Sequence, residues 1–200
     1  MGRGATAVWS HPREKRAATA TLVYRWTMLS FSKIELPIAG MSDLAAEARS
    51  QGYRFLERLE REWSTGANRF SGPGEALYAA FARSTQDTPG HPKESLGQLI
   101  AVAGLNRDPF LDDPGICRLR RVYVRAAWRN QGVGRALIAF ILADAGRHFR
   151  SIRLRAENHD AARLYERLGF EPIPDANATH ILHLTPKNEP KDEPKNESTP

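Results

Sequence analysis

The chain has 200 residues, of which 41% are hydrophobic, and it carries a formal net charge of +6 at pH 7. These values suit one globular domain and exclude a wholly disordered chain. No apolar run approaches the roughly 18 residues of a membrane helix, which excludes an integral membrane protein. The single cysteine, Cys117, excludes an internal disulfide framework and favours a reducing, cytoplasmic location. The positive charge predicts an anionic partner.

Most of that charge lies at the N-terminus. Residues 1–27 hold five basic residues and one acidic residue, whereas residues 186–200 are a Pro-, Lys- and Glu-rich near-repeat without apolar side chains. Such segments bury too little surface to offset the entropy of ordering. We therefore expect a basic disordered extension over 1–27, one domain over 28–185 and a disordered tail over 186–200. Met28 is an alternative start of translation.

The first half of the domain alternates between apolar and polar stretches. We expect a strand over Ile34–Ile38 and a helix capped by Ser42 or Asp43 that Gly52 ends. A second helix follows, with an apolar face from Tyr53 to Trp63. Strands are predicted next at 76–82, 99–105 and 119–124, joined by polar stretches at 84–94 and 106–115.

In the second half of the domain, the spacing of apolar residues changes to that of a helix. Apolar residues recur from Gly134 to Ala145 as a helical stripe, and a strand follows over Ser151–Ala156. Asn158 or Asp160 can cap a further helix, which Gly169 ends. A last strand is expected over His180–Leu184. The element order predicts an α/β fold, with a mixed twisted sheet flanked by helices.

The segment between the strand at 119–124 and the helix from 134 is the most informative. A short turn, residues 129–134, carries Gly132 and Gly134 and leads directly into the helix. The first N–H groups of a helix are unpaired and carry about half a positive charge, so they bind phosphate well. The arginines here have no acidic neighbour in sequence; they are Arg118, Arg120, Arg121, Arg125, Arg129 and Arg135.

The turn differs from two well-known phosphate-binding patterns. The P-loop lysine is absent, and a dinucleotide-binding G-x-G-x-x-G would need a glycine where Leu137 stands. The turn does fit Q/R-x-x-G-x-G/A through Arg129, Gly132 and Gly134. That short pattern by itself also describes a plain glycine-containing turn into a helix.

A second pattern follows about thirty residues later. It reads N-x-x-A-x-x-L-Y-x-x-x-G-F, from Asn158 to Phe170, across the expected strand-to-helix junction. The two patterns, in this order and on these elements, resemble the motifs of the GNAT N-acetyltransferase superfamily. The resemblance covers roughly residues 30–185 and implies the acyl-CoA N-acyltransferase fold, acetyl-CoA as cosubstrate and a primary amine as acceptor.

The resemblance also implies roles for particular residues. The strand end would pair with the pantetheine arm through the backbone of Val122, Tyr123 and Val124, and Asn158 would hydrogen-bond the same arm. Tyr165 would be the catalytic donor to the departing thiolate; the alternative is a core aromatic. The pyrophosphate would lie on the turn formed by Arg129, Asn130, Gln131, Gly132, Val133, Gly134 and Arg135.

The acceptor side is less defined. Many superfamily members carry an acid on the fourth strand, where this chain has arginines. Arg118 and Arg120 share one strand face, so they could bind an acceptor carboxylate or form ion pairs with Asp112 or Asp113. The acids considered as general base, without a ranking, are Glu57, Glu60, Glu75, Asp112 and Asp113.

Three function classes follow. The first is an acetyl-CoA-dependent N-acetyltransferase, for which a small molecule or amino acid is favoured over a protein as acceptor. The second is a CoA-thioester-binding sensor or interaction module without turnover. The third, a nucleic-acid-binding protein, lacks a base-reading motif, so neither a nucleic acid nor a membrane is an expected partner. His180 and His183 fall on opposite strand faces and predict no metal site. Homodimer formation stays open.

Overall fold

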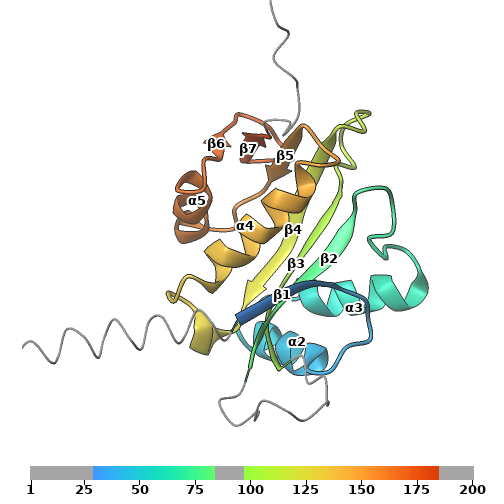
Figure 1. Cartoon of the computed structure of the whole chain (residues 1–200), viewed down its shortest axis with the longest axis vertical. Helices are drawn as coiled ribbons and strands as arrows, with labels where there is room; N and C mark the ends of the chain where they lie inside the picture. The colour runs from blue at the N-terminus through green and yellow to red at the C-terminus, as the bar shows by residue number, and fades with distance from the viewer. Residues whose placement is uncertain (1–28, 84–96, 185–200) are drawn as a thin grey trace, which may run out of the picture.

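A computed structural model describes residues 29–83 and 97–184. The expected polar connection at 84–94 and both predicted tails, 1–27 and 186–200, lie outside these ranges. In chain order the elements are β1 (Leu29–Ile34), α2 (Met41–Ser50), α3 (Phe55–Thr65), β2 (Ala76–Ala82), β3 (Gln98–Arg107), β4 (Ile116–Val124), the 3-10 turn η1 (Ala126–Trp128), α4 (Val133–Ala145), β5 (Ser151–Leu154), α5 (His159–Glu166), β6 (Glu171–Pro172) and β7 (His180–His183). Figure 1 shows their arrangement.

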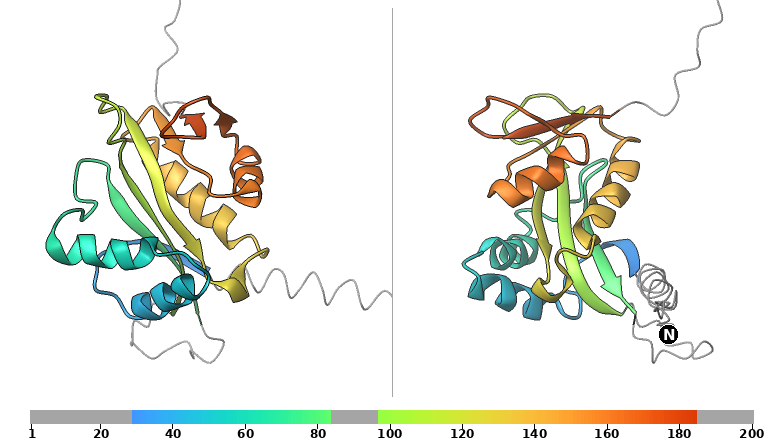
Figure 2. Two further views of the ribbon diagram at one scale, coloured as in Figure 1. Left: turned by 180° about the vertical axis from the view of Figure 1, so that it is seen from behind. Right: turned by 90° about the vertical axis from the view of Figure 1, so that its left-hand side faces the viewer.

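The described strands form one seven-stranded sheet in the order β1-β2-β3-β4-β5-β7-β6. Every neighbouring pair is antiparallel except β4 and β5, which are parallel. Helices α2 and α3 pack on one face and α4 on the other, as Figure 2 shows. The predicted mixed α/β fold is therefore confirmed. Because both faces are covered, all seven residues of β2 are buried, which explains its unbroken apolar run.

The first strand and helix differ in their bounds from the expectation. β1 ends at Ile34, where the prediction began, because its whole length pairs with β2, from Leu29 opposite Ala82 to Ile34 opposite Leu77. The N-cap of α2 is Gly40, in the left-handed conformation, and neither Ser42 nor Asp43 caps it. Ser42 instead donates a hydrogen bond from its hydroxyl to Glu60 of α3, at 3.2 Å.

A bulge interrupts β4 just after its pairing with β5 ends. The register with β3 shifts between Val102, opposite Tyr123, and Gly104, opposite Arg120. Arg121 lies in the bulge with a φ of +56°. Its guanidinium is buried against α3, where it donates to the Phe55 carbonyl at 2.9 Å and to the carboxylate of Glu62. Bulges bend and twist a strand, so this one sets the direction of the end of β4.

The ion pair between Glu62 and Arg121 is expected to stabilise this bend. Burial alone would raise the pKa of Glu62, but the hydrogen bond from Arg58 and the charges of Arg121 and Arg58 hold it below its usual range. We expect Glu62→Gln to lower the free energy of unfolding by about 3 kcal/mol at pH 7, because Arg121 would stay buried without a counter-charge. Urea unfolding measures this difference.

The pH dependence of the same difference has a defined sign. A carboxyl whose pKa is lowered in the folded state contributes stability above its unfolded pKa and loses it as pH falls through the folded value. The difference between the wild type and Glu62→Gln should therefore shrink below about pH 4. Glu57→Gln is the control, because the Glu57–Arg49 pair is more exposed and should contribute less than about 1 kcal/mol. An equal effect of both variants would contradict the account.

Candidate active site

The strands β4 and β5 part near the middle of the sheet. Their parallel pairing runs from Ile116 opposite Ser151 to Leu119 opposite Leu154, and β4 then continues to Val124 with none of the described strands on that side. Residues 122–124, the predicted contact for the pantetheine arm, lie in this unpaired part. Their peptide groups are thus placed where an extended ligand can add to the edge of β4 as another strand would.

The turn after β4 exposes a run of backbone N–H groups. Asn130 and Gly132 both have positive φ, +57° and +80°, and Gly132 is the N-cap of α4. In the described part of the chain, the N–H groups of residues 130–135 have no hydrogen-bond acceptor, and the first such bond of α4 is from Ala136 to the Gly132 carbonyl, at 3.0 Å. Successive free N–H groups at a helix start are a feature that binds anions in proteins generally.

The same turn contacts both other parts of the predicted site. A Cβ atom added at Gly134 would lie 3.5 Å from Cγ2 of Val124 and 3.6 Å from Cδ2 of Leu164. Leu164 precedes Tyr165 on α5, and Val124 ends β4. The two sequence patterns, which are some thirty residues apart, therefore meet at the start of α4.

Three of the arginines near this turn are paired with acids of the protein. Arg118 pairs with Asp108, which directly follows β3. Arg121 and Arg125 pair with Glu62 and Glu47, which are 59 and 78 residues away in sequence and reach β4 only through the tertiary fold. Arg135 is exposed, and no ion pair in the described residues involves it.

Arg129 and Gln131 fold back onto neighbouring elements. The Arg129 guanidinium donates to the Val124 carbonyl at 2.9 Å and to Gln51 at 2.6 Å, and it lies over the ring of Tyr123. Gln131 donates from its side chain to the Ala127 carbonyl at 2.8 Å, and its Oε1 is buried without a partner among the described residues. These contacts fix the shape of the turn and leave its N–H groups free.

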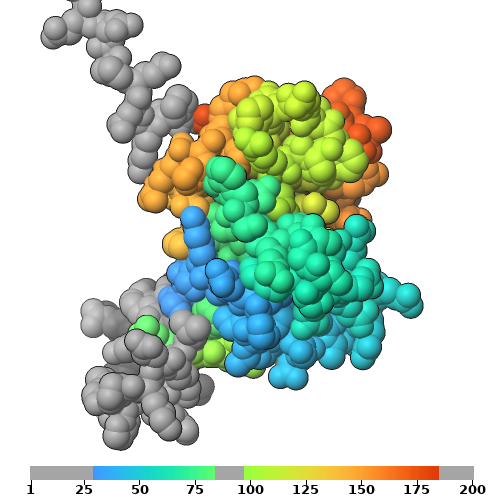
Figure 3. All heavy atoms as spheres, turned by 90° about the vertical axis from the view of Figure 1, so that its right-hand side faces the viewer, coloured from blue at the N-terminus to red at the C-terminus, as the bar shows by residue number. Residues whose placement is uncertain are grey.

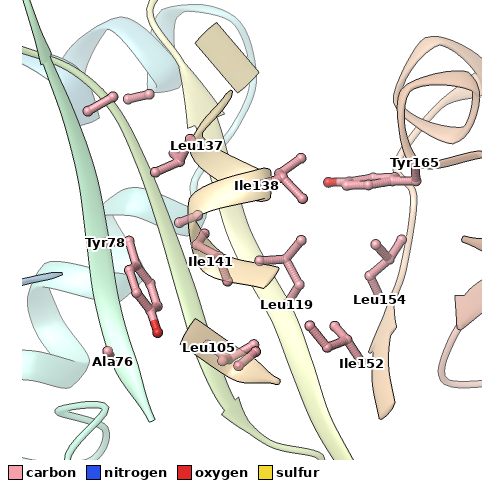
Figure 4. Close-up of a cluster of buried hydrophobic side chains, with 14 of the residues drawn as sticks. Ala76, Tyr78, Leu105, Leu119, Leu137, Ile138, Ile141, Ile152, Leu154 and Tyr165 are labelled. Atoms are coloured by element: carbon pink, nitrogen blue, oxygen red, sulfur yellow. The ribbon is translucent and has the colours of Figure 1, made fainter. Parts of the chain in front are cut away.

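Tyr165 lies in the core cluster between α4, β5 and α5. Figure 4 shows its ring reaching from α5 towards Ile138 of α4. The ring packs edge-on against Phe170, at 5.7 Å between centroids, and near His180, at 6.5 Å. Its hydroxyl has no hydrogen-bond partner in the described chain. Burial, together with the charge of Glu157, raises the pKa of Tyr165 to about 12, so the hydroxyl keeps its proton at neutral pH.

Asn158 has a structural contact beside its predicted ligand contact. It is the N-cap of α5, and its Oδ1 accepts a hydrogen bond from the Ala161 N–H at 2.9 Å. Of the two predicted caps, Asn158 and Asp160, the structure therefore has Asn158. The side-chain NH₂ of Asn158 points to no acceptor in the described residues and is exposed, so it is available to a ligand.

Most acids considered as general base are engaged elsewhere. Glu57 pairs with Arg49, Asp113 pairs with Arg150, and Glu75 accepts hydrogen bonds from Asn106 and from the Arg107 N–H. Sequence reasoning missed Glu62, which faces the bulge of β4. Its position three residues after the buried Leu59, on the same face of α3, was the available signal.

The described residues contain neither a metal site nor a membrane helix. No group of three or more His, Cys, Asp and Glu side chains within 29–83 and 97–184 is arranged to hold a metal ion. No helix in these ranges is long and apolar enough to cross a membrane.

Cys117 is buried beside the Ser151 carbonyl, and burial raises the pKa of its thiol, so it behaves as a small core residue.

Comparison with solved structures supports the fold. A crystal structure from Exiguobacterium sp. 255-15, described as that of an acetyltransferase, is 23% identical in sequence to this chain. Its TM-score is 0.64, and the match covers 78% of this chain and 93% of that one. A ribosomal-protein-alanine N-acetyltransferase from Escherichia coli is 20% identical, with a TM-score of 0.51 over 83% and 99%. The AtaT toxin, solved with the C-terminus of the antitoxin AtaR and acetyl-CoA, is 15% identical, with a TM-score of 0.56 over 78% and 94%.

The parted strands and the open turn fit the site that the resemblance to acyl-CoA-dependent N-acyltransferases implies. Residues 92–172, which include β3, β4, α4 and α5, match the family model of the acetyltransferase (GNAT) domain. Residues 92–172 therefore carry the GNAT acetyltransferase domain that the two sequence patterns predicted, and the fold around them resembles that of acetyltransferase structures. Enzymes of the family use acetyl-CoA, and the Escherichia coli enzyme is named for a ribosomal-protein acceptor.

Proposed function

We propose that the chain transfers the acetyl group of acetyl-CoA directly to the amine of a small molecule or amino acid. The observation that supports this most is the run of free N–H groups at 130–135, which lies beside Val124 at the end of the part of β4 that does not pair with β5. An anion held on this turn and an extended arm along β4 would bring a thioester to the opening between the strands. Tyr165 borders the same space from α5.

Each residue has a distinct part in the proposed binding. The N–H groups of residues 130–135 hold the pyrophosphate, and Arg135 adds a full charge beside them. The peptide groups of 122–124 pair with the pantetheine arm, and Asn158 adds a hydrogen bond from its side-chain NH₂. A backbone N–H of this part of β4 polarises the thioester carbonyl as negative charge develops on its oxygen.

Tyr165 acts on the departing sulfur. The amine nitrogen attacks the thioester carbon, the carbon–sulfur bond breaks, and the amine proton leaves to solvent. Because the pKa of Tyr165 is about 12 and that of an ordinary thiol about 8.5, full proton transfer to the thiolate would be uphill by about 5 kcal/mol. We therefore assign Tyr165 the role of a hydrogen-bond donor that stabilises the developing thiolate.

The second function class, a CoA-binding sensor without turnover, needs the same CoA-binding residues but no transfer of the acetyl group. The test measures CoA release and acetylated product over a panel of primary amines, with acetyl-CoA affinity measured in parallel. The proposal expects acetylated product from at least one small amine or amino acid, at a rate that Tyr165→Phe lowers. Tight acetyl-CoA binding with no transfer to any amine would favour the sensor and overturn the enzyme.

A further inference from the structure

Arginines face one another across the parallel pair β4–β5, on the sheet face that carries α2 and α3. Arg118 of β4 lies opposite Arg153 of β5 in the register. The next residues with the same orientation are Arg120 and Arg155, which would form the following pair if the strands did not part after Leu119. We call Arg118 and Arg153 the inner arginines, and Arg120 and Arg155 the outer arginines.

The inner arginines share a buried carboxylate. Asp108 has no exposed side-chain surface, and its Oδ2 lies 3.0 Å from Arg153 and 3.7 Å from Arg118. Arg153 also pairs with Asp175, at 2.7 Å, and Arg118 donates to the Asn177 carbonyl. Arg118 is therefore occupied by the protein itself, and it pairs with Asp108 rather than with Asp112 or Asp113.

The outer arginines have no such carboxylate. Among the described residues, Arg120 makes no ion pair and no side-chain hydrogen bond, and it is half-buried. Arg155 is exposed and donates to the Ala176 carbonyl at 2.6 Å. The charge of Arg120 is felt by Glu62, but the carboxylate of Glu62 is already shared by Arg58 and Arg121.

The four guanidinium groups lie close enough to affect one another. Burial, and then the charges of Arg120, Arg153 and Arg155, lower the pKa of Arg118, while Asp108 opposes this. Like charges across neighbouring strands are destabilising, so an anion between the outer arginines would be favoured there. Arginine binds a carboxylate through two parallel hydrogen bonds, which adds direction to the attraction.

The position of the outer arginines relates them to the reaction. Arg120 is the last β4 residue before the bulge and lies two residues before Val122, where the proposed thioester arm begins. The outer arginines therefore flank the opening between β4 and β5 from the face of α3. Figure 3 shows a neighbouring part of this face, where α2 and α3 lie below the light-green connection between β3 and β4.

We infer that Arg120 and Arg155 bind a carboxylate of the acceptor, so that the substrate is an amino acid or another amine that carries a carboxylate. The inner arginines with Asp108 show the same arrangement completed by the protein. The loop from Ile173 to Ala178, which receives hydrogen bonds from Arg118 and Arg155, holds the β5 side of this site in place. This inference rests on the proposed acetyltransfer.

The test compares matched acceptors with the full chain. Amino acids are assayed beside their carboxamides, and a phosphate-bearing amine of similar length is included. We expect kcat/KM to be more than 10-fold higher for the carboxylates than for the carboxamides. Arg120→Gln should abolish this preference mainly through KM, and Arg155→Gln should weaken it. Arg61→Gln, on the outer face of α3, should leave it unchanged.

The outcomes separate this inference from the function that it extends. No transfer to any amine would contradict the acetyltransferase itself. Transfer with equal kcat/KM for acids and carboxamides, or a preference that survives in both Arg120→Gln and Arg155→Gln, would overturn the carboxylate site. A higher kcat/KM for the phosphate-bearing amine than for the amino acids would show that the site prefers a phosphate, and this would also overturn the carboxylate site. Thermal melting identifies a variant that does not fold. In that case the comparison of amino acids with their carboxamides in the wild type decides whether the site binds a carboxylate.

Discussion

Tyr165→Phe is expected to lower kcat by about 100-fold while leaving acetyl-CoA affinity within about twofold, because a positioned proton or hydrogen-bond donor typically contributes 10²–10⁴-fold. The ring stays packed against Phe170, and no hydrogen bond within the described chain is lost. The free energy of unfolding should therefore change by less than about 0.5 kcal/mol. Steady-state kinetics and urea unfolding measure the two effects.

Tyr78→Phe is the matched control in the same core cluster. Tyr78 is buried on β2, away from the opening, and its hydroxyl donates to Asp144 at 2.7 Å. This variant should lower the free energy of unfolding by about 1.5 kcal/mol, since Asp144 loses a donor, and should leave kcat unchanged. If Tyr165→Phe and Tyr78→Phe changed kcat alike, Tyr165 would be a core residue only.

Gly132→Ala is expected to weaken acetyl-CoA binding by roughly 30-fold. Gly132 has a φ of +80°, a conformation that costs other residues about 1–2 kcal/mol. The alanine would relieve this strain by rotating the turn, and rotation moves the N–H groups of 130–135 off the pyrophosphate. The loss of one charge-assisted hydrogen bond between an N–H group and the pyrophosphate, about 2 kcal/mol, corresponds to a roughly 30-fold increase in the Kd for acetyl-CoA. Isothermal titration with acetyl-CoA measures it.

Gly52→Ala separates strain from ligand binding. Gly52 has nearly the same backbone conformation, with a φ of +86°, and nothing within 4 Å of an added Cβ. Both variants should therefore lose similar stability, about 1 kcal/mol, but Gly52→Ala should keep the wild-type Kd for acetyl-CoA. Equal Kd values in the two variants would contradict the role of the 130–135 turn.

The order of the elements was predictable because local patterns agreed with the final packing. The apolar run at 76–82 became a strand buried on both faces, and the stripe from Gly134 became α4. Asn158 was predictable as a cap because capping depends on a side chain and an N–H three residues away. The two ligand patterns could be placed for the same reason, since each is local to one junction.

The charge pairing was not predictable, because it depends on contacts between distant segments. Glu47 and Glu62 reach Arg125 and Arg121 across 78 and 59 residues of sequence. The bulge at Arg121 likewise follows from the register of β4 against β3, which no local pattern specifies. β6, of two residues, is too short to give a period and exists only because it pairs with β7.

The account depends on acetyl-CoA binding to the N–H groups of the turn before α4. Hydrogen–deuterium exchange of residues 130–135, measured with and without acetyl-CoA, tests this most directly. The N–H groups should exchange rapidly in the free protein, because they have no acceptor within residues 29–83 and 97–184, and slowly once acetyl-CoA is bound. Saturating acetyl-CoA that leaves their exchange unchanged, while protecting another segment, would contradict the proposed site.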